Sequence, residues 1–566
     1  MKCNTKFILR LALIVLLSCA SGVQIPALQL EKKQRSEFET WRQQAEGEYK
    51  AFVTKNERDF QEYREKINAD FAEFMKRSWE KVPVSQAIPA PKSPDPVTPP
   101  EAKPGQKPTA DPLPFAKVTP LPTPRPQPQP AAPIRRPDPQ PKPVTHIPTP
   151  VTPPAAAPIP KQATPQPPVT PIPKQSTPQA ATPDPIPVTP PKPQTVIPAP
   201  KPVMPPEKTA FSFLFYGTEC TVTLDDTMRF SLADTSEQSV AEAWKILSSD
   251  RYNALIIDSL DLREKLNLSD WGYMNLLKAM SEKFIGKKAG NEAVLLQMFV
   301  LTQSGYKVRI SRAGDQLALL VPFQDDICEY SYLNINGMKY YAMNKDLKGQ
   351  MFYIFNHEFP KEQYFSWQTG QPRLAVKLTS PKQFVSKLYP EIAVSVQVNQ
   401  NLIDYYNDYP LSSQWNLYAL AGLSETVKQA LYPVLQRAIA GKSKTQAAEM
   451  LLNFIQTGFA YQTDDRQFGY ERSFFADENF FYPYNDCEDR AILYAVLIKE
   501  LLDLNVVLVH SPGHLATAVH FPENVTGDHL VVDGRKFIIC DPTYIGANIG
   551  MVMDTYKQAN LEVIKL

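Results

Sequence analysis

The 566-residue chain lacks an excess of charge of either sign, because its 60 lysine and arginine residues are balanced by 59 aspartate and glutamate residues. A nucleic-acid-binding protein usually carries a basic excess, so we expect no nucleic-acid partner. Histidine and cysteine are scarce, with six of each, and they form no cluster with metal-ligand spacing. We therefore predict no metal site of the histidine and cysteine type.

A long apolar run is missing from the N-terminus. Lys2, Lys6 and Arg10 are followed by the apolar segment 11–17, which is too short to cross a bilayer and is typical of a secretory signal. The residues LLSC, which end at Cys19, resemble the lipobox of bacterial lipoproteins, in which the cysteine is lipidated. Residues 1–19 are thus predicted to be a signal with a lipid anchor at Cys19, and cleavage after Ala20 is the alternative. Either way we expect an exported protein of the cell envelope, facing the periplasm or the cell surface, and the lipobox reading adds membrane contact through the lipid.

Proline is scarce outside one segment, since 45 of the 57 prolines lie between Pro83 and Pro206. This segment also has few apolar side chains with which to offset the entropy of ordering. Its composition predicts a disordered, extended spacer over residues 83–207.

The charged region 25–82 repeats its aromatic residues every eleven positions. Eleven residues make three helical turns, so a helix here would carry one aromatic stripe. We expect this stripe to mediate self-association, packing on the globular part or docking to another envelope protein. The stripe consists of Phe38, Trp41, Tyr49, Phe52, Phe60, Tyr63, Phe71 and Phe74.

The C-terminal region 401–566 contains a cysteine at the predicted start of a helix. Asp486 can cap this helix, Asp489 can complete a weak capping box, and the apolar pattern continues to Leu502. Cys487 would then lie in the first turn, where backbone N–H groups favour a thiolate. Glu488 and Asp489 oppose that effect, so a cationic partner is needed.

Strands predicted downstream supply that partner. The pattern predicts a strand, a turn at 511–513 and a second strand that begins at His514. A hairpin at 533–534 and then Asp541 follow. A helix with cysteine, a strand with histidine and a later strand with aspartate allow the histidine to lie beside the thiol and the aspartate behind the histidine. His510 and His520 are rival bases.

The blocks DCEDRA, PGHLATAV and CDPTY resemble those of the transglutaminase-like branch of the papain-like superfamily, as in bacterial transglutaminase-like cysteine peptidases. The resemblance covers residues 450 to 550. It implies Cys487 as nucleophile, His514 as general base and acid, and Asp541 as the residue that orients the imidazole. The Cys487 backbone N–H is the default oxyanion donor. Side-chain candidates for that role, without a motif match, are Gln462, Gln467 and Tyr482.

The middle region 209–400 repeats the same order of elements without the chemistry. Laid over the C-terminal region, it has Gln316 in place of the histidine, Asn344 in place of the aspartate and no thiol at 289–291. This pattern indicates a degenerate transglutaminase-like copy, although any helix followed by antiparallel strands gives a similar match. The predicted fold class is therefore α+β, with an N-terminal helix, a spacer, a degenerate domain and an active papain-like domain.

The function expected from these features is hydrolysis of peptide or protein amide bonds through an acyl-thioester. Transglutaminase or deamidase action on glutamine side chains is one alternative, and a non-catalytic peptide-binding scaffold, with the three residues serving only structural roles, is another. No cofactor is expected, although some relatives bind calcium through acids near the cysteine, and Glu488 or Asp489 could serve. A disulfide between Cys220 and Cys328 is compatible with a free catalytic Cys487.

Overall fold

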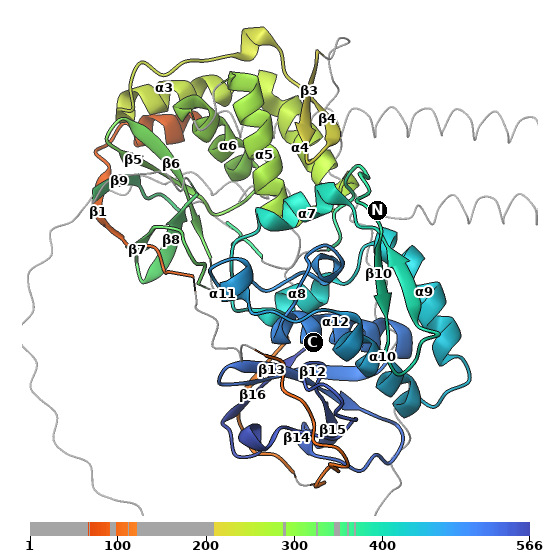
Figure 1. Cartoon of the computed structure of the whole chain (residues 1–566). Helices are drawn as coiled ribbons and strands as arrows, with labels where there is room; N and C mark the ends of the chain where they lie inside the picture. The colour runs from red at the N-terminus through yellow and green to blue at the C-terminus, as the bar shows by residue number, and fades with distance from the viewer. Residues whose placement is uncertain are drawn as a thin grey trace, which may run out of the picture. The chain divides into compact units, whose positions relative to one another are not determined.

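The structure of the chain is a computed structural model with helices and mainly antiparallel sheets (Figure 1), which confirms the α+β class. Cys19, the aromatic positions from Phe38 to Tyr63 and most of the predicted spacer lie outside the residues that the structure describes. The described residues are 66, 68–90, 98–110, 112–121, 209–286, 290–323, 326–343, 351–358, 362–366 and 370–566.

The middle region combines four α-helices with a hairpin and a closed barrel. The α-helices are α3 Glu237–Leu247, α4 Asn253–Lys265, α5 Asp270–Ile285 and α6 Asn291–Gln303, and the short 3-10 helices are η1 Asp226–Met228 and η2 Asp250–Tyr252. The hairpin consists of β3 Ala210–Phe215 and β4 Thr218–Thr223. The barrel has the order β1-β7-β8-β6-β5-β9, with β1 Glu80–Ser85, β5 Arg309–Ala313, β6 Gln316–Pro322, β7 Tyr332–Ile335, β8 Met338–Ala342 and β9 Met351–Phe355.

The C-terminal region packs helices against a six-stranded sheet and adds a separate two-stranded sheet. Its helices are α7 Gln400–Asn407, α8 Trp415–Ala421, α9 Glu425–Ile439, α10 Lys444–Gly458, α11 Asp464–Gln467, η3 Ala476–Phe480, α12 Cys487–Leu502 and η4 Asp554–Tyr556. The large sheet has the order β14-β15-β13-β12-β16-β2, with β2 Phe115–Thr119, β12 Asn505–Ser511, β13 His514–His520, β14 His529–Val532, β15 Arg535–Cys540 and β16 Leu561–Lys565. The small sheet pairs β10 Lys382–Val385 with β11 Ala393–Val396.

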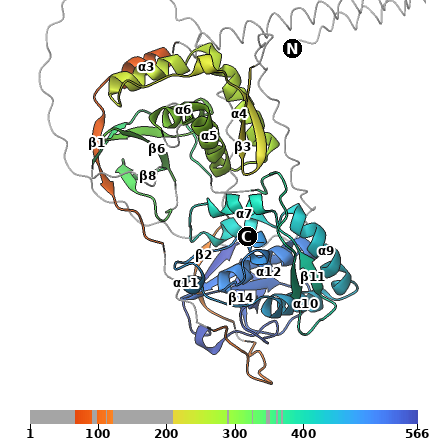
Figure 2. The same ribbon diagram turned by 45° about the horizontal axis from the view of Figure 1, so that its top comes forward.

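The two large sheets share one strand order. The series β7-β8-β6-β5-β9 in the barrel corresponds strand by strand to β14-β15-β13-β12-β16, and in both an N-terminal strand, β1 or β2, follows as the sixth. The helix that precedes each sheet, α6 or α12, lies against the third strand of the series (Figure 2). The similarity noted in the sequence therefore extends to topology.

The register also agrees between the two sheets. Thr517, three residues into β13, pairs with Cys540. Leu319, three residues into β6, accepts a hydrogen bond from the backbone of Met343. Position 344 therefore corresponds to 541, as the sequence overlay proposed, although Asn344 itself lies outside the described residues.

The N-terminal predictions need correction where the structure describes them. Within the segment 25–82, which is predicted to be one helix, residues 68–75 are helical, but Glu80 begins strand β1. The spacer predicted from residue 83 contains the end of β1 and all of β2, so the described parts of it are not disordered. Pairing of β1 with β9 and of β2 with β16 satisfies backbone groups of both segments despite the surrounding prolines.

The last two aromatic residues of the predicted stripe pack on the middle region. Phe71 is buried and makes edge contacts with Trp244 and Phe355, at centroid distances of 5.0 Å each. Phe74 lies 5.5 Å from Phe355 and 4.9 Å from the ring of His357. This end of the stripe therefore belongs to the core of the same chain.

Helix α12 is the central element of the C-terminal core. The predicted capping box of Asp486 and Asp489 is confirmed, and the helix ends at Leu502 as predicted. Its side chains are buried from Cys487 to Ile498, and it contacts β12, β13, α8 and α10 (Figure 1). In the part of the chain that the structure describes, no helix is both long and apolar enough to cross a membrane.

The disulfide considered for the middle region is absent. Cys220, buried in β4, and Cys328, whose backbone N–H donates to the carbonyl of Leu411, are both free thiols. Burial raises the pKa of Cys220 to about 11, so this thiol stays protonated and behaves as a small apolar side chain. Cys487 and Cys540 are also thiols outside any disulfide of the described residues.

Candidate active site

Cys487 is the first residue of α12 and is 3 % exposed. Its Sγ accepts a hydrogen bond from the backbone N–H of Leu515 at 3.4 Å. The sulfur also lies 3.3 Å from Oε2 of Glu488, in the geometry of a thiol donor and a carboxylate acceptor. The nucleophile candidate is therefore held at the helix start, next to the residue that follows His514.

His514 and Asp541 form the second part of the site. Nε2 of His514 lies 2.8 Å from Oδ2 of Asp541, and the side chains are 3 % and 2 % exposed. An ionised carboxylate only accepts, so the pairing puts a hydrogen on Nε2 and leaves Nδ1 as the ring nitrogen that can take a proton. His514 begins β13 and Asp541 follows the last residue of the neighbouring β15, which brings the two together.

The other oxygen of Asp541 is held by its own loop. Oδ1 accepts backbone N–H groups from Thr543 at 2.9 Å and from Tyr544 at 3.2 Å. Gln456, buried in α10, donates its amide to the carbonyls of Asp541, Tyr544 and Ala547. Both the orientation of the carboxylate and the position of its loop are thus fixed by hydrogen bonds.

Tyr556 covers the imidazole. Its ring stacks on His514 with centroids 5.0 Å apart and an interplanar angle of 6°. Tyr556 also packs against the buried cluster of Tyr544, Ala547, Met551 and Met553, which follows Asp541 along the chain. The His514–Asp541 hydrogen bond is consequently shielded from water, which strengthens it.

The rival histidines have other environments. His510, the last but one residue of the adjacent strand β12, lies 4.8 Å from the ring of Trp415 and 3.9 Å from Glu562. Burial lowers its pKa. His520 ends β13, at the opposite end from His514, and its Nδ1 contacts the carbonyl of Lys536. Of the three histidines, His514 is the one beside Asp541.

Arg490 places a positive charge near the sulfur. It is buried one turn into α12, where its Nε donates to Asn485 and its second guanidinium nitrogen donates to the carbonyl of Phe459. Burial lowers its pKa to about 10, while the nearby Asp486, Asp489 and Cys487 favour its charged form. Arg490 therefore remains a cation at neutral pH and offsets part of the acidic charge around it.

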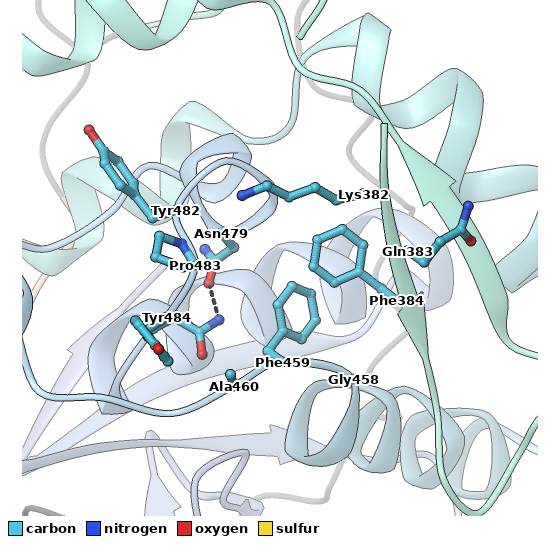
Figure 3. Close-up of a pocket in the computed structure, with 11 residues that line it drawn as sticks. Lys382, Gln383, Phe384, Gly458, Phe459, Ala460, Asn479, Tyr482, Pro483 and Tyr484 are labelled. Carbon is cyan, nitrogen blue, oxygen red and sulfur yellow. Dashed lines mark hydrogen bonds between the residues drawn. The ribbon is translucent and has the colours of Figure 1, made fainter. Parts of the chain in front are cut away.

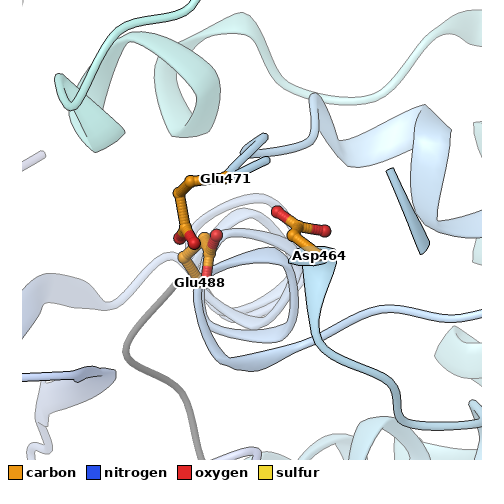
Figure 4. A group of neighbouring side chains, drawn as sticks. All are labelled: Asp464, Glu471 and Glu488. Atoms are coloured by element: carbon orange, nitrogen blue, oxygen red, sulfur yellow. The ribbon is translucent and has the colours of Figure 1, made fainter. Parts of the chain in front are cut away.

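Five acidic residues gather beside the start of α12. Carboxylate oxygens of Asp464, Asp486 and Asp489 lie within 4.8 Å of one another, and so do those of Asp464, Glu471 and Glu488 (Figure 4). Four of the five residues are buried, and Glu471 is half-buried. Burial and the charges of Asp464 and Glu488 raise the pKa of Asp489 well above its usual range. An all-oxygen set of this kind could hold a hard cation such as Ca²⁺.

The side-chain oxyanion candidates differ in position. The backbone N–H of Gln462 donates to the carbonyl of Asn485, so Gln462 lies beside the segment that leads into Cys487. Gln467 donates its amide to the carbonyl of Tyr484 at 3.3 Å. Tyr482 directs its hydroxyl to Asn407 of α7 at 2.7 Å. Gln462 and Gln467 therefore both contact the segment that leads into Cys487, whereas the hydroxyl of Tyr482 is engaged with α7.

The middle region repeats the local geometry with different atoms. Asn291 is the first residue of α6, and its Oδ1 accepts the backbone N–H of Leu317 at 2.8 Å. Leu317 follows Gln316 as Leu515 follows His514, so Asn291 occupies the position of Cys487. Gln316 is exposed, unlike His514.

Comparisons with protein-family models, with curated protein sequences and with solved structures found no match to this chain.

Sequence reasoning missed three residues that shape this site: Gln456, Arg490 and Tyr556. Arg490 lies inside the quoted block DCEDRA and carried a usable signal, because an arginine on an otherwise apolar helix needs buried partners. Gln456 and Tyr556 lie far from the three blocks along the chain. Only the packing of α10 and η4 against the Asp541 loop and His514 brings them to the site.

Proposed function

We propose that the protein is a cysteine hydrolase that cleaves amide bonds of peptides or proteins. The observation that carries this proposal is the 2.8 Å pairing of His514 Nε2 with Asp541 at the start of β13. The backbone N–H of the next residue, Leu515, contacts the sulfur of Cys487. A buried cysteine, a strand-end histidine and a turn-forming aspartate would not need this shared geometry. Their convergence supports a catalytic triad.

The chemistry follows from these three groups. His514 Nδ1 takes the proton of Cys487, and the resulting thiolate attacks the carbonyl carbon of the amide. The C–N bond breaks as the imidazolium returns that proton to the leaving nitrogen, which leaves an acyl-thioester on the sulfur. A water molecule, deprotonated by His514, then attacks the thioester, and the C–S bond breaks to release the acid. The backbone N–H of Cys487 is the default donor to the oxyanion, with Gln462 as a side-chain candidate.

Calcium fits the acidic residues beside α12. Asp464, Asp486 and Asp489 offer carboxylate oxygens within 4.8 Å, and Glu488 belongs to the overlapping set. Bound calcium would neutralise charge that otherwise opposes a thiolate. Glu488 is the acid in contact with Sγ, so its charge state directly affects the thiol.

Transfer to an amine or deamidation of glutamine would use the same acyl-thioester. Hydrolysis remains the favoured outcome because the bacterial proteins that the three blocks resemble are mostly peptidases. Release of ammonia from a glutamine-containing peptide, without cleavage of its backbone, would identify deamidation. A scaffold function, in which neither domain cuts, would leave Cys487 an ordinary thiol.

We propose further that the middle region is a non-catalytic copy of the C-terminal domain. The shared strand order, the shared register and the matching position of Asn291 support common architecture. Neither Asn291 nor Gln316 offers a nucleophile or a titratable base. The chain as a whole would act in the cell envelope, held there by a lipid on Cys19.

The test of the catalytic proposal is the pH dependence of iodoacetamide alkylation at Cys487 in the full-length protein, read by peptide mass mapping. An ordinary thiol ionises near pH ~8.5, so its labelling slows steeply below neutral pH. We expect rapid labelling below pH ~7 that disappears in His514→Ala. Equal, slow labelling in both proteins with an ordinary thiol profile would reject catalysis and favour the scaffold.

A further inference from the structure

A pocket of about 450 Å³ opens beside the segment that leads into α12. Its walls come from three stretches of the C-terminal region: 382–384 in β10, 458–460 at the end of α10, and 479 with 482–485 before Cys487. Figure 3 shows the rings of Phe384 and Phe459 at its centre and the hydroxyl of Tyr482 turned away from it.

The inner wall of the pocket is tied to the nucleophile through Asn485. Asn485 is buried, and its backbone N–H donates to the carbonyl of Ala460 on the facing wall at 3.2 Å. Its side chain donates to Asn479 at 2.8 Å and accepts from Arg490 at 2.9 Å. Two residues of chain reach at most about 7 Å, so this wall lies close to Cys487. A side chain bound in the pocket would belong to a residue near the scissile bond.

The floor of the pocket is apolar and rigid. The rings of Phe384 and Phe459 lie 4.8 Å apart, and Phe480 packs on both, at 5.2 and 5.5 Å. These rings belong to the main core of the C-terminal region. Tyr484 is 39 % exposed at the rim. A concave aromatic surface of this kind suits a bulky apolar side chain.

Lys382 adds a positive charge to one edge of the same pocket. Its ammonium group donates to the carbonyl of Phe481, and burial lowers its pKa. Among the described residues no carboxylate pairs with it. A partly buried ammonium group without a counter-ion is suited to an anionic group on a ligand.

We propose that this pocket selects the substrate: it binds the side chain of a bulky apolar residue, and Lys382 pairs with the carboxylate of an adjacent acidic residue. The ligand class is an extended polypeptide with an aromatic residue next to an aspartate or glutamate. This inference deepens the proposed hydrolase function, and it rests on that function only for the idea that the bound segment is a substrate.

The inference is tested by binding to the full-length Cys487→Ala protein, which cannot turn the ligand over. The probe is a fluorescein-labelled Gly-Phe-Asp-Gly peptide amide, followed by fluorescence anisotropy. Replacing Phe with Gly should weaken binding by about 10-fold or more, the effect of losing a buried aromatic side chain. Replacing Asp with Asn should weaken it by about 2- to 5-fold, the range of a partly exposed ion pair.

Charge reversal supplies the matched control. In the Cys487→Ala background, Lys382→Glu should lose the preference for Asp and favour a Gly-Phe-Lys-Gly probe. Lys387→Glu, an exposed lysine five residues along and outside the pocket, should behave like its parent. Ala460→Phe, which fills the pocket from its exposed wall, should abolish the preference for Phe over Gly.

Equal affinity for all the probes, or identical behaviour of the two lysine variants, would overturn the pocket assignment. The alkylation profile of Cys487 distinguishes this failure from failure of the proposed function. Rapid labelling below pH ~7 with unselective binding would reject the pocket alone. Selective binding with an ordinary thiol profile would retain the pocket as a peptide site and reject the hydrolase.

Discussion

Replacing Asp541 with asparagine should reverse the hydrogen bonding behind His514. In the wild type, Oδ2 faces Nε2 of His514, and Oδ1 accepts the N–H groups of Thr543 and Tyr544. An asparagine that keeps its oxygen on those two donors turns its NH₂ toward Nε2. Nε2 must then accept, which moves the imidazole hydrogen to Nδ1 and removes the site that would take the proton of Cys487 in the proposed mechanism. The opposite orientation of the amide is unfavourable, because its NH₂ group would face the backbone N–H groups of Thr543 and Tyr544, which are also donors.

The magnitude follows from the buried position of this pair. A hydrogen bond to a charged group is worth about 1.5–3 kcal/mol, and a buried group left without a partner costs about 1–3 kcal/mol more. Together these correspond to a loss of about 10²- to 10⁴-fold in any rate that depends on the ion pair. The loss that alkylation at pH 6.5 can show is limited to about 100-fold, because an ordinary thiol is still about 1 % thiolate at that pH. We therefore expect the labelling rate of Asp541→Asn to fall by up to about 100-fold.

Asp528→Asn is the matched control for this experiment. Asp528 is also buried, accepts through both oxygens, from Thr109 and from the backbone of Val552, and adjoins the same sheet. It contacts neither His514 nor Cys487 in any hydrogen bond of the described residues. Its substitution should lower stability without changing the labelling profile. A labelling rate for Asp541→Asn that equals the wild type would refute the tautomer argument.

Three further predictions concern stability and the surroundings of the triad. Burial raises the pKa of Asp477 to about 6 from 3.8, so the folded state binds the proton of this carboxyl more tightly than the unfolded state does. The contribution of Asp477 to the free energy of unfolding therefore grows by up to about 3 kcal/mol as the pH falls through 6 toward 4. In Asp477→Asn this part of the pH dependence, measured by urea unfolding, should vanish. Calcium at 100 times its dissociation constant should stabilise the protein by about 2.7 kcal/mol, and EGTA or Asp464→Asn should remove that gain in a thermal-shift assay. Tyr556→Ala should slow alkylation of Cys487 by about 2- to 12-fold, the factor that corresponds to the interaction free energy of one aromatic pair. Tyr556→Phe should retain the wild-type rate.

Each of these predictions has a contrary result. A pH profile unchanged by Asp477→Asn would mean that another acid dominates this window. Equal stabilisation by calcium and magnesium at the same low concentration, or a calcium response that persists in Asp464→Asn, would reject the proposed cation site. Equal labelling rates in Tyr556→Ala and Tyr556→Phe would show that stacking does not support the base.

The elements that hold the candidate site were predictable because their signals are local. The capping box at Asp486, the helix end at Leu502, the strand start at His514 and the hairpin at 533–534 are all confirmed. Each depends on residues within one turn of helix or one strand, where side-chain pattern and backbone geometry are directly linked. The sequence order of these elements also sufficed to propose which residues face one another.

The parts that escaped prediction depend on pairing between distant segments. Strand β1 closes the barrel by pairing with β7 and β9, and β2 pairs with β16, although each lies among prolines that favour an extended, unpaired chain. Nothing local distinguishes such a segment from a spacer, because sheet edges far along the chain determine whether it is ordered. The same holds for Gln456, whose amide reaches a loop 85 residues away.

The middle region indicates that the proposed chemistry would depend on the surroundings of Cys487, His514 and Asp541 as well as on these three residues themselves. Asn291 keeps the contact that Cys487 makes with the next strand, at 2.8 rather than 3.4 Å, since oxygen is a smaller atom than sulfur. That contact holds the helix to the sheet in both regions and therefore serves the fold. The position of His514 is different, because Gln316 is exposed while His514 is buried. A thiol at position 291 would lack a shielded base, so the middle region has the framework of the candidate site without the environment that would make a cysteine reactive.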